Sequence, residues 1–165
     1  MLKLKRTAYI TRIIVIVIVF FSIFSCSDKK AEAEEELLIT YLENHKIEIE
    51  PFADGLYYIP YNDTSEVIPN FTSHSKGDSL ILVYKGYLLS DTTVVFTEKN
   101  EEEPGVYVYK IDDVLEGFEE GMGYIEKGDS AKLIIPSKLA YGKERVGLIK
   151  PYSTLIFEIK VINVR

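Results

Sequence analysis

The spacing of apolar residues predicts a helix at the start of the folded region and a short strand after it. Leucine and tyrosine residues recur at helical spacing, so residues 31–46 are expected to form an amphipathic helix with His45 at its end. Asp54-Gly55 is a turn signal, and residues 56–61 are predicted to form a short strand whose proline favours a sheet edge.

The rest of the chain alternates between apolar, strand-like runs and turns. Polar residues dominate 62–78, which predicts a loop with His74 at the surface. The connections are too short for parallel crossovers, so the predicted fold class is α+β: an antiparallel sheet wrapped around one short helix, with an N-terminal helical extension. The predicted strands are 79–89, 93–96, 106–111, 130–136 and 154–164, and the short helix is 114–122, with Asp112 or Asp113 as its N-cap.

The first 25 residues have the order of a secretory signal peptide. Basic residues without any acid come first, and residues 13–24 are apolar apart from one serine, a run shorter than the ~20 residues of a membrane span. The run ends beside Cys26 and resembles the lipobox of bacterial lipoproteins, although Phe24 is bulkier than the usual residue there. The resemblance implies a signal peptide over residues 1–25 and a lipid on Cys26. An uncleaved membrane anchor is the alternative.

Charge is distributed unevenly about Cys26. Four of the 19 basic residues precede it, and all 26 acidic residues follow it. The chain beyond Cys26 is therefore expected to be soluble and to be repelled by anionic lipid head groups, with residues 26–36 as a charged tether. Ser27 follows the cysteine where an aspartate would retain a lipoprotein at the inner membrane. This favours the outer membrane, with the folded part in the periplasm or at the cell surface.

Composition excludes several classes of function. The chain has 165 residues, 47% of them hydrophobic, and a formal net charge of −7, so it is globular and lacks the basic surface that nucleic acid requires. One cysteine and two histidines leave no disulfide framework or cysteine zinc site, and we expect no metal and no cofactor. The acidic stretch 98–104 suggests a cation site, but its consecutive carboxylates favour a solvated loop.

Motifs for nucleophilic or metal-dependent catalysis are absent from the sequence, whereas aromatic residues are spread over several predicted elements. Such residues form either an aromatic cup on a concave sheet or an ordinary aromatic core, and their spacing does not decide between the two. The residues concerned are Tyr84, Phe96, Phe118, Tyr141 and Phe157.

Ordered local motifs carry a more specific signal. They are Val83-Tyr84-Lys85-Gly86, Val114-Leu115-Glu116-Gly117-Phe118-Glu119-Glu120-Gly121, Lys127-Gly128-Asp129, Ile135-Pro136-Ser137, Leu139-Ala140-Tyr141-Gly142 and Pro151 to Phe157. In this order they resemble the FKBP-type peptidyl-prolyl isomerase domain, which would occupy residues 77–165 after an extension over residues 37–76. The extension is similar to that of exported bacterial members, among them FKBP-type lipoproteins associated with gliding motility.

The resemblance implies an enzyme that isomerises proline-containing polypeptides in an apolar pocket. Phe118 would form the pocket floor where the family usually has tryptophan. The hydroxyl of Tyr141 and the backbone N–H of Leu115 would bind substrate carbonyls. By matching motif, the catalytic residues are Tyr84, Phe96, Leu115, Phe118, Tyr141 and Phe157, and further substrate-binding residues are Val114, Leu148 and Ile149.

The sequence departs from the family pattern inside this pocket. Thr97 replaces an aspartate, Gly105 replaces an aromatic residue unless the strand is shifted to offer Tyr107, and the loop 142–150 is shorter, with Lys150 in place of a proline. Three hypotheses therefore stay open. The chain is a lipid-anchored isomerase that assists the folding of exported proteins, a non-catalytic FKBP-like binding module or chaperone subunit of an envelope complex, or a purely structural envelope lipoprotein. The ordered motifs favour the first hypothesis, and the departures are the features that favour the second.

Overall fold

The computed structural model describes residues 29–52, 54–61 and 73–165. The predicted signal peptide, Cys26 and most of the predicted loop 62–78 lie outside these ranges. Within the described ranges, no helix is long and apolar enough to cross a membrane. Leu37–Arg165 form one compact unit, which contains the sheet and the predicted pocket residues.

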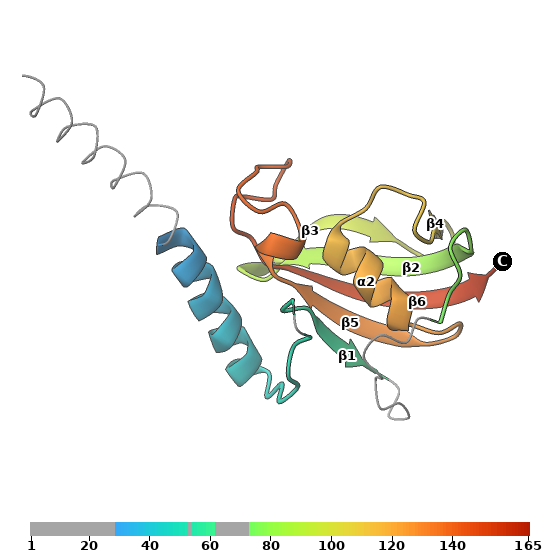
Figure 1. The fold of residues 1–165 in the computed structure, drawn as a ribbon. Helices are drawn as coiled ribbons and strands as arrows, with labels where there is room; N and C mark the ends of the chain where they lie inside the picture. The colour runs from blue at the N-terminus through green and yellow to red at the C-terminus, as the bar shows by residue number, and fades with distance from the viewer. Residues whose placement is uncertain (1–28, 53, 62–72) are drawn as a thin grey trace, which may run out of the picture. The chain divides into compact units, whose positions relative to one another are not determined.

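The described residues form a sheet of six antiparallel strands, which confirms the predicted α+β class (Figure 1). The strands are β1 (Tyr57–Pro60), β2 (Ser79–Leu88), β3 (Asp91–Lys99), β4 (Gly105–Val108), β5 (Ser130–Ile135) and β6 (Leu155–Val164). Their order is β1-β5-β6-β2-β3. One edge of β2 pairs first with β4, up to Leu82, and then with β3, from Tyr84 onward. The sheet edge therefore divides into two branches at this point.

Side chains of the central strands alternate between two apolar layers, as the two-residue period of a strand requires. On β6, Leu155 and Phe157 belong to the main core with the helix α2 (Glu116–Tyr124), which lies across this face of the sheet in Figure 1. Ile156, between them, belongs to a second cluster with Tyr41 and Tyr87. Tyr41 comes from the N-terminal helix, which covers residues 29–44, close to the predicted 31–46.

Helix α2 begins two residues later than predicted, and the predicted aspartate cap is wrong. Leu115 occupies the N-cap position and makes no side-chain capping hydrogen bond. Asp112 is used elsewhere: its Oδ2 accepts a hydrogen bond of 2.7 Å from the backbone N–H of Val108 and closes the turn after β4. The carboxylate therefore satisfies a backbone donor of the strand and not one of the helix.

His74 is buried, so its predicted surface position is also wrong. Its Nε2 lies 2.8 Å from the carbonyl oxygen of Ile125, the C-cap residue of α2. Its ring packs edge-on against Tyr109, with 5.7 Å between the centroids. Helix C-termini leave carbonyl groups without intrahelical donors. His74 supplies one donor, and the backbone N–H of Ser73 supplies another to the carbonyl of Gly123.

Strands β3 and β4 differ from their predicted bounds, whereas His45 lies where it was predicted. β3 is longer than predicted because Glu98 and Lys99 continue the ladder with β2, although their charges suggested a loop. β4 is shorter than predicted, because Lys110 adopts a left-handed conformation with a φ of 56°, which an extended strand does not contain. His45 follows the last helical turn and stacks on Tyr41 at 4.0 Å, which confirms its predicted place at the helix end.

Candidate functional site

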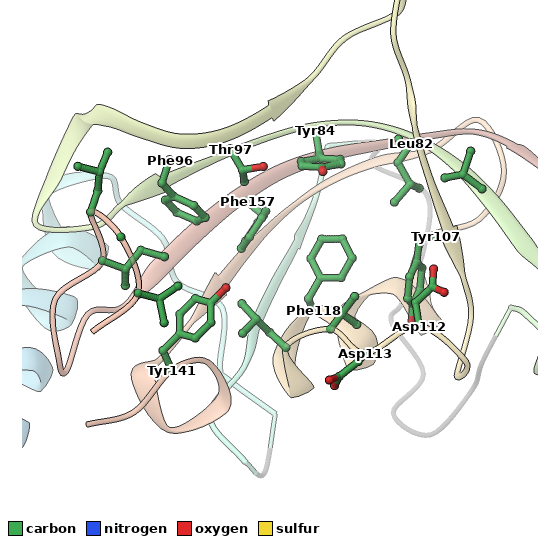
Figure 2. Close-up of a pocket in the computed structure, with 18 residues that line it drawn as sticks. Leu82, Tyr84, Phe96, Thr97, Tyr107, Asp112, Asp113, Phe118, Tyr141 and Phe157 are labelled. Carbon is green, nitrogen blue, oxygen red and sulfur yellow. The ribbon is translucent and has the colours of Figure 1, made fainter. Parts of the chain in front are cut away.

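A cavity of about 750 Å³ lies between α2 and the face of the sheet near the point where β2 changes partner. All nine residues predicted for the site line this one cavity (Figure 2). They come from β2, β3, α2, β6 and the loops on either side of the cavity. The other lining residues are Leu82, Thr97, Gly105, Val106, Tyr107, Asp112, Asp113, Val146 and Gly147.

Aromatic rings form the inner wall of the cavity. Phe118 on α2 lies 5.2 Å from Phe157 on β6, measured between ring centroids, and 5.8 Å from Tyr107 on β4. Tyr84 lies 6.3 Å from Phe118, and Phe96 lies 5.5 Å from Phe157. These pairs meet edge to face, the geometry that aromatic quadrupoles favour. The cavity therefore offers an apolar surface made of several fixed rings.

Gly86 makes room for this ring cluster. It pairs with Thr97 on one side and with Phe157 on the other side of β2. A Cβ atom at this position would lie 2.9 Å from both the Phe96 and the Phe157 rings and 2.7 Å from the methyl group of Thr97. Because Gly86 has no side chain, the rings of Phe96 on β3 and Phe157 on β6 can pack against the backbone of β2. The sequence motif Val83-Tyr84-Lys85-Gly86 contains this glycine, but its spatial role was not predicted.

Two hydrogen-bond donors border the apolar wall. The Tyr141 hydroxyl points toward Phe157 in Figure 2 and makes no hydrogen bond with a described residue. The backbone N–H of Leu115, the N-cap residue of α2, likewise finds no acceptor among the described residues. Both residues are half-buried, and both donors are available to the carbonyl groups of a bound molecule.

Tyr107 supplies the aromatic wall that Gly105 lacks. Of the two positions considered from the sequence, Tyr107 is the one that brings a ring to the cavity, almost fully buried against Phe118. Burial raises the pKa of Tyr107 to about 12, so its hydroxyl stays protonated at neutral pH. The hydroxyl oxygen accepts a hydrogen bond of 3.4 Å from the backbone N–H of Lys110. Tyr107 is therefore a fixed neutral wall of the cavity.

Four aliphatic side chains at the mouth of the cavity are exposed: Val106, Val114, Val146 and Leu148. Leu148 lies on a tight turn in which Val146 and Ile149 exchange backbone hydrogen bonds of 3.1 and 2.9 Å. Val106 and Val146 were not predicted. The alternation of valine and tyrosine along residues 106–109 places Val106 on the face opposite Tyr107, so the pattern gave no sign that Val106 lines the cavity.

The chemistry available in the cavity is binding and desolvation of an apolar group with donors at its edge. The titratable residues that line it are three tyrosines and two aspartates, Asp112 and Asp113. Among the residues that the structure describes, no group of three or more His, Cys, Asp or Glu side chains could hold a metal ion. The acidic loop after β3 is exposed, and Asn100 Oδ1 accepts hydrogen bonds from the backbone N–H groups of Glu102 and Glu103.

An antiparallel sheet crossed by one short helix, with an aromatic cavity between them, defines the class of the domain as α+β with a ligand-sized apolar cavity. Residues 72–162 match the family model of the FKBP-type peptidyl-prolyl cis-trans isomerase. The chain belongs to this family. The match covers every residue predicted for the site.

Named relatives agree with the family match. The chain is 37% identical over 100 residues to peptidyl-prolyl cis-trans isomerase FKBP14 of Homo sapiens, covering 58% of this chain and 47% of that protein. It is 38% identical over 88 residues to FkpA, the FKBP-type isomerase of Escherichia coli K12, covering 53% of this chain and 32% of that protein. The chain thus spans about half the length, or less, of these curated relatives.

Solved structures show the same fold. The crystal structure of FkpA from Escherichia coli covers 86% of this chain with a TM-score of 0.66 and 29% identity, and 63% of FkpA is covered in turn. A peptidyl-prolyl isomerase from Pseudomonas syringae matches with a TM-score of 0.63 and 24% identity, over 84% of this chain and 95% of that one. The second likeness concerns the fold alone.

Proposed function

We propose that this chain is a peptidyl-prolyl cis-trans isomerase that acts on proline-containing polypeptides through the aromatic cavity. The observation that carries the proposal is the convergence of all nine predicted residues on one cavity. The proline ring would lie against Phe118, with Phe157 and Tyr84 beside it. An apolar ring of this size suits a cavity whose inner wall consists of aromatic side chains.

The reaction needs neither a nucleophile nor a proton transfer. Rotation about an X-Pro bond is slow because it breaks amide resonance, with a barrier of about 18–20 kcal/mol. The planar amide is more polar than the twisted transition state, because resonance moves charge from nitrogen to oxygen. A dry aromatic cavity therefore destabilises the planar form relative to the twisted form, and only such a difference accelerates the step.

Oriented hydrogen bonds add to this effect. Tyr141 and the Leu115 N–H would hold the substrate carbonyl groups on either side of the X-Pro bond. Rotation would then be confined to this one bond of the substrate. An acceleration from about 100 seconds to about 10 milliseconds corresponds to ~10⁴-fold, or ~5.5 kcal/mol. One or two hydrogen bonds at ~0.5–1.5 kcal/mol each leave the larger share to desolvation and positioning.

A lipid anchor on Cys26 is part of the proposal. The basic start, the apolar run 13–24 and the single cysteine support it, together with the likeness of the extension to gliding-motility-associated FKBP-type lipoproteins. The clients would then be exported proteins at a bacterial envelope, with the outer membrane favoured by Ser27. Mass spectrometry of the protein from membranes should show a lipidated N-terminal cysteine. Unmodified Cys26 in the membrane fraction would overturn the anchor and leave the isomerase proposal standing.

A non-catalytic binding module is the second candidate. Thr97 lines the cavity where the family pattern has an aspartate, and exposed Val106 and Leu148 at the mouth suit apolar client segments. A module of this kind would bind proline peptides in the same cavity without accelerating their isomerisation.

A protease-free isomerisation assay on the full chain separates these functions. We expect clear acceleration with a peptide that has an apolar residue before proline. Tyr141→Phe should lower kcat/KM by about three- to tenfold, since it removes one hydrogen bond. Tyr61→Phe is the matched control, because the Tyr61 hydroxyl donates to Glu158 outside the cavity. Peptide binding without acceleration would favour the binding module, and no binding at millimolar peptide would favour a structural lipoprotein.

A further inference from the structure

The charged residues that line the cavity are all acidic. They are Asp112 and Asp113, and none of the described lining residues is basic. Both aspartates are exposed at the end of the cavity formed by the loop between β4 and α2. A chain that enters the cavity with its proline against Phe118 would therefore pass an acidic edge.

The two aspartates differ in what they contact. Asp112 is committed to the fold, because its Oδ2 holds the N–H of Val108 at 2.7 Å. Asp113 makes no hydrogen bond and no ion pair with any residue that the structure describes. Figure 2 places Asp113 at the outer edge of the cavity, below Phe118. Its carboxylate is available to a ligand.

Asp113 lies close to a donor that the proposed reaction uses. It is two residues before Leu115, whose unpaired N–H borders the cavity. Two residues of chain span at most ~7 Å. A substrate carbonyl bound at Leu115 would therefore bring the side chains one or two residues from the proline within reach of the Asp113 carboxylate. A lysine or arginine side chain is long enough to meet it.

The loop that leads from Tyr141 to Val146 has a different charge, but its charged residues do not line the cavity. Lys143 and Arg145 are exposed in the loop that leads from Tyr141 to Val146, with Glu144 between them, and none of the three lines the cavity. The acidic lining residues are thus confined to the segment that leads to Leu115. A preference that it creates depends on the side of the proline that carries the charge.

We propose that Asp113 makes this cavity select proline-containing segments with a lysine or arginine within two residues of the proline, on the side bound at Leu115. The inference deepens the proposed function and rests on it for the position of the substrate. Exposed ion pairs contribute ~0.2–1 kcal/mol. The expected preference for lysine over glutamate at that position is therefore up to about fivefold, and it decreases at high salt.

Peptides that differ only in one residue test this inference. Lysine, glutamine or glutamate is placed one or two residues before or after the proline, and both kcat/KM and Kd are measured with the full chain. We expect a lysine-to-glutamate ratio of about two to five on one side of the proline, which Asp113→Asn reduces toward one. Glu126→Gln, an exposed acid outside the cavity, is the matched control and should keep the ratio of the wild type.

The outcomes are distinguishable from failure of the proposed function. A ratio of one in the wild type, or the same ratio in Asp113→Asn, overturns the role of Asp113 and assigns any preference to the net charge of the chain. A preference of equal size on both sides of the proline overturns it as well. If no peptide is isomerised, the enzyme proposal fails, and the Kd ratios alone decide whether Asp113 selects basic segments.

Discussion

Gly105 shows how one residue adapts the cavity to a departure from the family pattern. A Cβ atom at this position would lie 2.9 Å from Cε1 of Tyr84 and 3.5 Å from Cγ of Lys99. Contacts below 3.0 Å force a neighbour to move, so the glycine is what lets β4 approach the Tyr84 ring. Tyr107, two residues further on, then provides the ring that packs on Phe118. The missing aromatic side chain is thus replaced from the next inward position of the same strand.

Gly105→Ala should therefore displace the Tyr84 ring and reshape the cavity. We expect kcat/KM to fall by about tenfold, equivalent to ~1.4 kcal/mol, because overpacking typically costs ~1–3 kcal/mol. The measurement is the isomerisation rate together with the urea unfolding midpoint. Combining the change with Tyr84→Leu should restore part of the loss in a double-mutant cycle. Additive effects of the two changes would contradict a steric coupling between Gly105 and Tyr84.

At the scale of elements, the position of α2 depends on its glycines. Added Cβ atoms at Gly117 and Gly121 would collide with Ile135 and Leu133 on β5, with 2.5 Å to Ile135 Cγ2 in the first case. The helix therefore lies closer to the sheet than side chains at these positions would permit. This closeness brings Phe118 within 5.2 Å of Phe157 on the sheet.

Gly121→Ala is expected to destabilise the protein, although alanine favours helix. Helix propensity alone would stabilise the variant by ~1 kcal/mol. The collision with Leu133 should outweigh this gain and give a net loss of ~1–3 kcal/mol in the free energy of unfolding. Urea denaturation followed by circular dichroism measures the sign directly. A variant more stable than the wild type would show that α2 has room to move away from β5.

The sequence predicted elements where local pattern and tertiary contact agree. The strands β2, β5 and β6 were predicted within one residue of their ends, because apolar residues continue through them. The charges of Glu98 and Lys99 predict a loop, because pairing with β2 is a long-range contact that charge does not reveal. His74 is another such case, because its acceptor on Ile125 lies 51 residues away. The site residues came from ordered motifs, whereas Val106 and Val146 carry no motif.

At the scale of the whole molecule, an acid pair joins the segment before β1 to α2. Phe52 packs on Tyr124 with 4.8 Å between ring centroids, and the Tyr124 hydroxyl donates to Glu120 at 3.3 Å. Burial and a hydrogen bond to Asp54 raise the pKa of Glu120 to about 7, from an ordinary value of 4.5. The same hydrogen bond lowers the pKa of Asp54, with a smaller contribution from Lys138. Protonated Glu120 therefore donates to ionised Asp54 at mildly acidic pH.

This pair predicts the pH dependence of stability. Between pH 4.5 and about 7 the folded chain binds more protons at Glu120 than the unfolded chain, so stability falls as pH rises through this window. Glu120→Gln keeps a neutral donor toward Asp54 at every pH. The variant should gain stability relative to the wild type at pH 8 and gain less at pH 5. Glu126→Gln is the control, and an equal gain at both pH values in Glu120→Gln would contradict the shared proton.

The most direct test of the central claim is exchange NMR on the full chain with a proline peptide whose cis and trans forms give separate signals. The wild type at a small fraction of the peptide concentration should produce cis–trans exchange peaks. Phe157→Ala should abolish them, whereas Ile156→Ala, the adjacent truncation on the opposite face of β6, should retain them in the folded fraction. No exchange with the wild type, or equal exchange with Phe157→Ala, would contradict isomerisation in the aromatic cavity.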